Sequence, residues 1–64
     1  MKPVLEYDAA ANAAYIRFSS ETILESEEIA TGIVLDYDAQ GHIVGMEVLD
    51  ARQHLYPKTL HEAA

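Results

Sequence analysis

The carboxylates most suggestive of chemistry lie in the segment from Asp36 to Glu47, which reads DYDAQGHIVGME. The segment matches the calcium-binding loop of an EF-hand, D-x-[DN]-x-[DN]-G-x5-E, at every defined position except Gln40, where that loop has Asp or Asn. Such a loop binds Ca²⁺ through carboxylate and carbonyl oxygens. The same residues have a second explanation, because Asp38 and Gly41 also suit the first and last positions of a type I turn between two strands.

The residues on either side of this segment decide between the two explanations. An EF-hand loop lies between two helices, whereas both flanks here are rich in the β-branched residues typical of strands. In an extended strand Glu47 would lie about 20 Å from Gly41, too far to reach a cation at the turn. We therefore predict a β-hairpin. Only Asp36 and Asp38, two apart on a strand and so on one face, are retained as candidates for a weak cation site of another kind.

No other group of residues has the spacing of a catalytic or metal site. The chain has no cysteine, and no third ligand is clearly spaced to join Asp50 and His54, which are four residues apart. Ser19, Ser20 and Ser26 lie in an acidic segment without the glycine-rich elbow of a nucleophilic serine. We predict a protein that is not an enzyme and holds no cofactor.

Two similar segments indicate the elements that position these side chains. Leu5–Ala9, LEYDA, is echoed as Leu35–Ala39, LDYDA, and an apolar segment follows each copy. The alternation of side chains with period two predicts strands, with one hairpin in each half of the chain. We expect an antiparallel four-stranded β-meander of two consecutive hairpins over about residues 3–49, whose third and fourth strands cover residues 33–37 and 43–49.

The residues between these strands predict the turns. Asp8 opens the first hairpin loop, and Asn12, which tolerates positive φ, closes it. Gly32 marks the entry to the third strand. Residues 19–31 are acidic and irregular in pattern, and we expect a loop there in which residues 22–24 or 28–29 extend a neighbouring strand.

The C-terminal tail, about residues 50–62, predicts a short helix. Asp50 is a suitable N-cap for a helix over Ala51–Tyr56. Pro57 either interrupts this helix or begins a second one as its first residue. With Leu60 as an anchor the tail can pack on one face of the sheet, which makes the fold α+β.

Length and charge limit the class of protein. The 64 residues predict a single small domain, residues 1–64, with 11 acidic and 4 basic residues and a net charge of −7. A protein that binds nucleic acid directly would carry the opposite charge. Glu6 and Asp8 interrupt any apolar N-terminal run, so we expect no signal peptide, no membrane association and a cytoplasmic location. The acidity either keeps the protein soluble or provides a surface for a basic partner.

A chain this short buries little of its surface, and we therefore expect a homo-oligomer, most simply a dimer. The strands after Gly32 carry apolar groups on both faces, and tyrosines in strands often contact a partner. Acidic residues near position 25 would dock basic side chains. The interface candidates are therefore Val34, Val44, Met46, Val48, Tyr15, Glu25, Glu27 and Glu28.

Several segments together resemble a known family. They are YD at Tyr7, NAAYI from Asn12, and LDYDxxGxIVGxExLDA from Leu35 to Ala51. This pattern resembles the small bacterial family called domain of unknown function 2283 over roughly residues 4–52. Asn12 stands where the family usually has Asp, and Ala14 where it usually has Leu.

The resemblance implies a small sheet with a C-terminal helix in a cytoplasmic bacterial protein. It implies no activity and no catalytic residues. Some members are encoded beside short genes suspected to encode toxins, which would suit an acidic protein that binds another protein.

These observations lead to several functional hypotheses. The leading one is a non-enzymatic protein–protein interaction module, in its most concrete form an antitoxin-like protein that masks a basic partner. The alternatives are a self-assembling homo-oligomer with no other partner, and an acidic mimic that occupies a nucleic-acid-binding surface. A weak metal-binding protein or a small hydrolase comes last.

Overall fold

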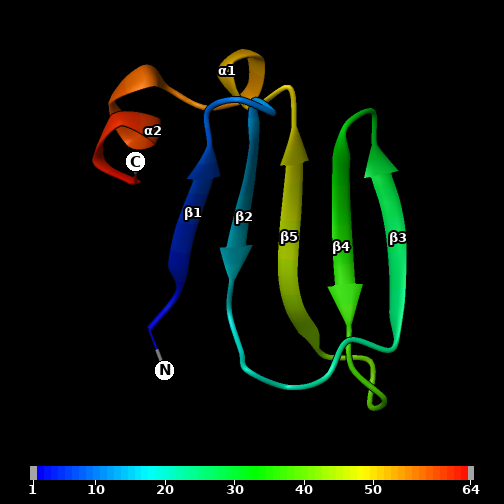
Figure 1. Ribbon diagram of the computed structural model, residues 1–64. Helices are drawn as coiled ribbons and strands as arrows, with labels where there is room; N and C mark the ends of the chain where they lie inside the picture. Colours follow the sequence, from blue (N-terminus) through cyan, green and yellow to red (C-terminus); the bar gives the residue numbers. More distant parts are fainter. Residues whose placement is uncertain (1, 64) are drawn as a thin grey trace.

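Five antiparallel strands form one sheet, and two short helices follow them (Figure 1). The computed structural model describes residues 2–63. The elements are β1 Val4–Asp8, β2 Ala13–Arg17, β3 Glu25–Ala30, β4 Ile33–Tyr37, β5 Ile43–Leu49, α1 Ala51–His54 and α2 Pro57–Ala63. The order across the sheet is β1-β2-β5-β4-β3. The α+β class is confirmed, but the sheet has five strands where the sequence predicted four.

Both predicted hairpins are present, and their turns follow the expected chemistry. β1 pairs with β2, and β4 pairs with β5. In the second loop the Asp38 carboxylate accepts hydrogen bonds from the backbone N–H groups of Gln40 and His42, both at 2.9 Å. Gly41 has a φ of 83° and donates its N–H to the Asp38 carbonyl at 3.1 Å. This hydrogen-bonded turn accounts for the EF-hand-like sequence pattern without a calcium ion.

The additional strand is β3, which lies in the segment for which we predicted an irregular acidic loop. It pairs with β4 at one edge of the sheet, and all six of its residues are exposed. An edge strand needs only a backbone ladder to one neighbour, so no apolar alternation is required and none marks it in the sequence.

The strand order also differs from a meander, because β2 lies beside β5 and not beside β4. The chain leaves β2 and passes beneath the ends of β5 and β4 to reach the far edge (Figure 1). Two successive backbone N–H groups of this crossing, from Phe18 and Ser19, donate to the Val44 carbonyl at 2.8 and 3.1 Å.

Asp50 occupies the predicted N-cap position, but its side chain does not cap the helix, and α1 ends at His54 where the sequence predicted Tyr56. Asp50 has a left-handed backbone with φ 52°, and its side chain makes no capping bond. Asn12 takes that role from the first hairpin loop, because its Oδ1 accepts the Arg52 backbone N–H at 3.0 Å and its carbonyl accepts the Ala51 N–H at 2.9 Å. The positive φ predicted for Asn12 is confirmed at 52°. Pro57 begins a second helix, which is one of the two expected outcomes.

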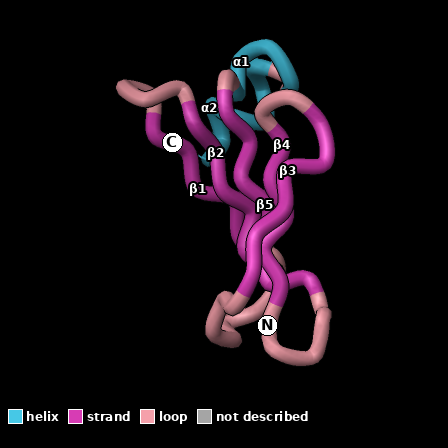
Figure 2. The backbone as a smooth tube through the Cα atoms, turned by 90° about the vertical axis from the view of Figure 1, so that its right-hand side faces the viewer, coloured by secondary structure: helices cyan, strands magenta, loops and turns pink. Residues whose placement is uncertain are grey.

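The helices cover one face of the sheet, which we call the helix face, and only at one end (Figure 2). The buried cluster there consists of Ala14, Val48, Ala51 and Leu60, so the predicted anchor role of Leu60 is confirmed. The opposite face, which we call the polar face, carries Tyr15 and Glu47, since these residues pair directly across β2 and β5. In residues 2–63 no helix is long and apolar enough to cross a membrane.

Candidate interaction surfaces

The centre of the polar face holds a hydrogen-bonded group built from three strands. Tyr15 on β2 donates its Oη–H to Asp36 Oδ2 on β4 at 2.8 Å, and Ser26 on β3 donates to Asp36 Oδ1 at 2.6 Å. Asp36 is only 8% exposed. Because both its oxygens accept a hydrogen bond, the buried carboxylate is satisfied by the protein itself. The group therefore ties the edge strand β3 to the middle of the sheet.

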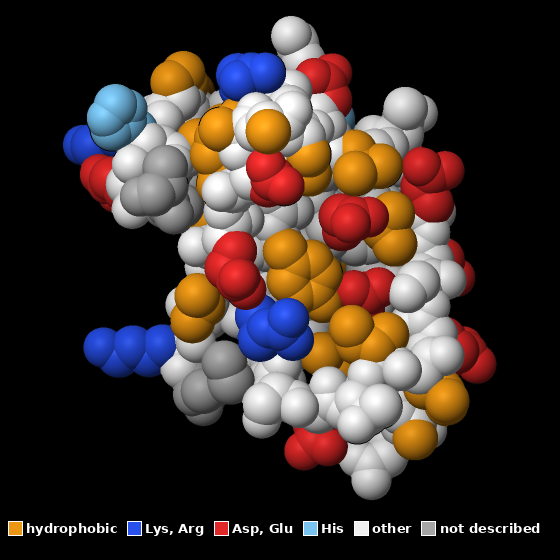
Figure 3. Space-filling model, in the orientation of Figure 1, with side chains coloured by type: hydrophobic (Ala, Val, Ile, Leu, Met, Phe, Trp, Pro, Cys, Tyr) orange, Lys and Arg blue, Asp and Glu red, His pale blue; other side chains and the backbone are white. Residues whose placement is uncertain are grey.

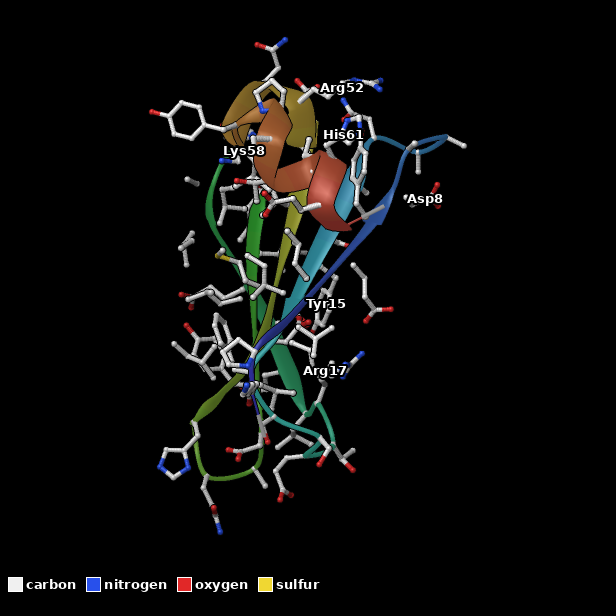
Figure 4. The ribbon with its side chains drawn as sticks, turned by 90° about the vertical axis from the view of Figure 1, so that its left-hand side faces the viewer. Asp8, Tyr15, Arg17, Arg52, Lys58 and His61 are labelled. Atoms are coloured by element: carbon white, nitrogen blue, oxygen red, sulfur yellow. The ribbon has the colours of Figure 1, made fainter. Side chains whose placement is uncertain are left out.

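Gly45 allows the tyrosine to reach across β5. Gly45 lies between Arg17 and Asp36 in the strand registers. A Cβ at Gly45 would come within 2.7 Å of Tyr15 Cε2 and still closer to its hydroxyl. The Arg17 guanidinium lies 5.1 Å from the centre of the Tyr15 ring, within range of a cation–π interaction. Figure 4 shows Tyr15 and Arg17 next to each other on the same side of the sheet.

The surroundings of Tyr15 suit a structural donor better than a proton-transfer group. Burial, followed by the hydrogen bond to Asp36, raises the pKa of Tyr15 to about 12. The phenol therefore stays protonated at neutral pH and donates to the carboxylate. A general base works best with a pKa near the working pH, so this shift points away from acid–base catalysis.

The two candidate cation ligands, Asp36 and Asp38, serve different parts of the fold. Asp36 is held by Tyr15 and Ser26, whereas Asp38 lies beyond the end of β4 and accepts turn N–H groups. The N–H of His42 is the main cause that lowers the pKa of Asp38. Across residues 2–63 no three His, Cys, Asp or Glu side chains gather as a metal site would require.

The histidine that follows Asp50 is engaged at the end of β5. His54 Nδ1 lies 3.1 Å from the Leu49 carbonyl and 3.3 Å from the Asp50 carbonyl. Since carbonyl oxygens only accept, Nδ1 carries the proton in this arrangement. The contact ties α1 to the end of β5.

Comparison with known protein families agrees with the resemblance seen in the sequence. The family model described as "Protein of unknown function (DUF2283)" matches residues 5–52. The chain belongs to this family. No curated protein and no solved structure matches it. In this DUF2283 chain the matched residues include Tyr15, Asp36 and Gly45, whereas α2 lies beyond them.

The acidic interface candidates of the DUF2283 chain all lie on the edge strand β3. Glu25 pairs with Tyr37 and Glu27 with Leu35, so both face the helix side of the sheet. Glu28 lies opposite Val34 on the polar side. All three are exposed. Acidic side chains therefore flank the outer edge of β3 on both of its faces. On the face seen in Figure 3, acidic groups gather along the right-hand margin, where β3 lies.

The apolar interface candidates are not brought together. Val34 pairs with Glu47 and belongs to the polar face, whereas Met46 pairs with Leu35 on the helix face. Val44 and Val48 are 0% and 1% exposed, so they are buried within the chain and offer no surface to a partner. Of the apolar set, only Val34 and Met46 are partly accessible, and they lie on opposite faces.

The hydrogen-bonded group of Tyr15 and Asp36 was not predicted as a unit, although each residue was a candidate on its own. One signal in the sequence could have indicated it. A glycine inside a strand, such as Gly45 between apolar neighbours, often marks a place where another group approaches the backbone closely. Asp36, at an inner position of an apolar strand, is the polar partner that such an approach requires.

Proposed function

We propose that this DUF2283 protein is a non-enzymatic interaction module that binds a basic protein along the acidic edge of β3. The observation that carries the proposal is the edge strand itself, whose six residues are exposed and include Glu25, Glu27 and Glu28. Its outer side has no neighbouring strand in the sheet. An extended segment of a partner can pair with such an edge through backbone hydrogen bonds.

The charge distribution supports a basic partner. The chain carries a net charge of −7, and β3 contains three carboxylates and no basic residue. Carboxylates on both faces of one strand favour lysine or arginine on both faces of an added strand, because directly opposed residues of unlike charge attract. The same charges speed encounter with a basic protein and disfavour acidic ones. In its most concrete form this is an antitoxin-like role in which the module masks a basic toxin.

A non-enzymatic role is supported by how the polar groups are used. The Asp36 carboxylate and the Tyr15 hydroxyl are bonded to each other, and His54 contacts backbone carbonyls. These side chains hold strands together, and their partners leave no activated nucleophile or base among them.

The test is a pull-down from lysate of the native host at low and at high salt, with mass spectrometry of the retained proteins. The bait is the full chain, compared with a triple variant Glu25→Gln, Glu27→Gln and Glu28→Gln. A matched control replaces three exposed acids elsewhere by glutamine: Glu6, Glu47 and Glu62. Both variants lose the same formal charge.

We expect one small basic protein to be retained by the wild type and by the control at low salt, and to be lost at high salt. The β3 variant should not retain it. If the β3 variant and the control lose the basic protein equally, the interaction depends only on net charge and the proposal is wrong. Recovery of no basic protein would also contradict the proposal. If DNA or RNA displaces the retained protein, the module covers that protein's nucleic-acid-binding surface.

A further inference from the structure

We propose that the uncovered part of the helix face binds a second copy of this chain and forms a symmetric dimer. Its apolar part lies away from the outer edge of β3, so the test with Ile43→Glu is independent of the proposed function, whereas Glu27 borders both surfaces. The helix face carries no charged side chain on β1, β2, β5 or β4. Its residues on these strands are Leu5, Tyr7, Ala14, Ile16, Ile33, Leu35, Tyr37, Val44, Met46 and Val48. Ile43 joins them because a β-bulge shifts the register there and pairs Ile43 with Tyr37.

The helices leave much of this apolar face open. α2 packs on β1, and the buried cluster gathers near Ala14 and Leu60. Ile16 and Leu35, farther along the same face, lie outside that cluster. Ile43 is 46% exposed. Figures 2 and 4 both show the helices at one end of the sheet and no element over the rest of this face. We call the open part the bare half, defined by Ile16, Leu35, Tyr37 and Ile43, none of which packs against the buried cluster.

The charge of the chain selects the occupant of the bare half. A protein with a net charge of −7 repels its own copy wherever carboxylates would face each other. The polar face has Glu6 and Glu47 at its surface, so two copies cannot approach closely there. The bare half is uncharged, which permits self-association and offers a basic protein no particular attraction.

The size of the surface is sufficient for a small dimer. The molecule measures 33 × 26 × 17 Å, with the sheet in its broad plane. About half of that plane offers on the order of 500 Å² per copy, or roughly 1,000 Å² in total, which reaches the lower limit of specific interfaces. Only five hydrophobic residues are buried in the monomer, Ala14, Val44, Val48, Ala51 and Leu60, among residues 2–63. A core this small gains much from additional apolar burial.

The position of α2 on the helix face favours a two-fold arrangement. α2 packs on β1, at the opposite edge of the sheet from β3 (Figure 1). A two-fold axis parallel to the strands places α2 of the second copy over β4 and β3 of the first. The exposed side chains of α2 include Lys58, His61 and Glu62, whereas β3 presents Glu27 to this face opposite Leu35. Lys58 lies on the helix-bearing side of the sheet in Figure 4. Lys58 of each copy thereby comes within reach of Glu27 of the other, twice in one dimer.

The test is sedimentation velocity of the full chain over a range of concentrations, with Ile43→Glu as the disrupting variant. The matched control is Val4→Glu, because Val4 is also 46% exposed but shares the polar face with Arg17. We expect the wild type and the control to reach twice the monomer mass of 7.1 kDa. Ile43→Glu should dissociate at least about tenfold more readily, because it would bury an unpaired carboxylate in the interface. Circular dichroism confirms that each variant is folded.

A charge exchange tests the same interface at residues whose replacement leaves the core intact. Lys58→Glu should weaken the dimer about threefold, as expected for an exposed ion pair, and the addition of Glu27→Lys should restore it. A wild type that stays at 7.1 kDa at millimolar concentration overturns the proposal. So does a dimer that Ile43→Glu and Val4→Glu weaken equally. If Lys58→Glu has no effect, the two-fold arrangement given above is wrong.

Discussion

Replacement of Gly45 by alanine should destabilise the protein through a clash with Tyr15. The Tyr15 ring crosses β5 at Gly45 to reach Asp36, and an alanine Cβ would come within 2.7 Å of its Cε2. Because that Cβ belongs to the backbone of a central strand, the ring must move. The hydrogen bond to Asp36 is then lost, and Ser26 remains as its partner on the other oxygen.

The magnitude follows from the contacts that are lost. A hydrogen bond to a charged group contributes about 1.5–3 kcal/mol, and the contact between the ring and Arg17 about 0.5–1 kcal/mol. Alanine in a strand offsets part of this, because glycine costs roughly 0.5–1 kcal/mol there. We expect the free energy of unfolding to fall by about 2 kcal/mol. For a domain of this length that corresponds to a melting temperature lower by roughly 10 °C.

The assay is urea unfolding followed by far-UV circular dichroism, applied as a double-mutant cycle. The four proteins are the wild type, Gly45→Ala, Tyr15→Ala and the double variant. In the Tyr15→Ala background the clash is absent, so Gly45→Ala should be neutral or stabilising by up to about 1 kcal/mol. The sign of the Gly45→Ala effect should therefore change between the two backgrounds. Equal destabilisation in both would show that the tyrosine is not the reason for the glycine.

Three further predictions follow from the same contacts. Asn12→Ala should lower the free energy of unfolding by about 2 kcal/mol, since it removes the cap at the Arg52 N–H and places alanine at positive φ. Asn12→Gly should recover the part of this loss that comes from alanine at positive φ, as measured by thermal denaturation. Folding raises the pKa of Tyr15 to about 12 and so favours its neutral phenol. The contribution of this phenol to stability should be complete below pH 10 and decline as the pH rises to about 12. Urea unfolding midpoints of Tyr15→Phe should lack this decline. Folding lowers the pKa of Asp38 below 3.8, so its contribution is present above that pH and is lost as the pH falls through the lowered value. Asp38→Asn, which can still accept from the His42 N–H, should show a smaller loss between pH 5 and pH 2 in the same assay.

The sequence proposed eight interface candidates, and the structure brings only some of them together. The sequence identified Glu25, Glu27 and Glu28 as docking candidates, and the structure places all three on one exposed edge strand. It also grouped Val34 with Met46, which the register assigns to opposite faces. Alternation within one strand says which residues share a face, but only pairing between strands relates the faces of two strands to each other.

The sequence by itself determined the local elements of this protein. The bounds of β4 and β5 and the positive φ of Asn12 were predicted, and a helix that begins at Pro57 was one of two expected outcomes. Each depends on the chemistry of a few consecutive residues. Alternation selects a strand, a side chain that tolerates positive φ closes a turn, and the fixed φ of proline begins a helix.

Only the tertiary structure decided what lies side by side. β3 has no apolar pattern of its own and becomes a strand because β4 offers it an edge. Asn12 caps a helix that begins 39 residues later, and Tyr15 reaches Asp36 across Gly45. These contacts join residues that are distant in the chain, and their free energy depends on burial and on strand order. No local pattern encodes either quantity, because both arise only when the whole sheet has assembled.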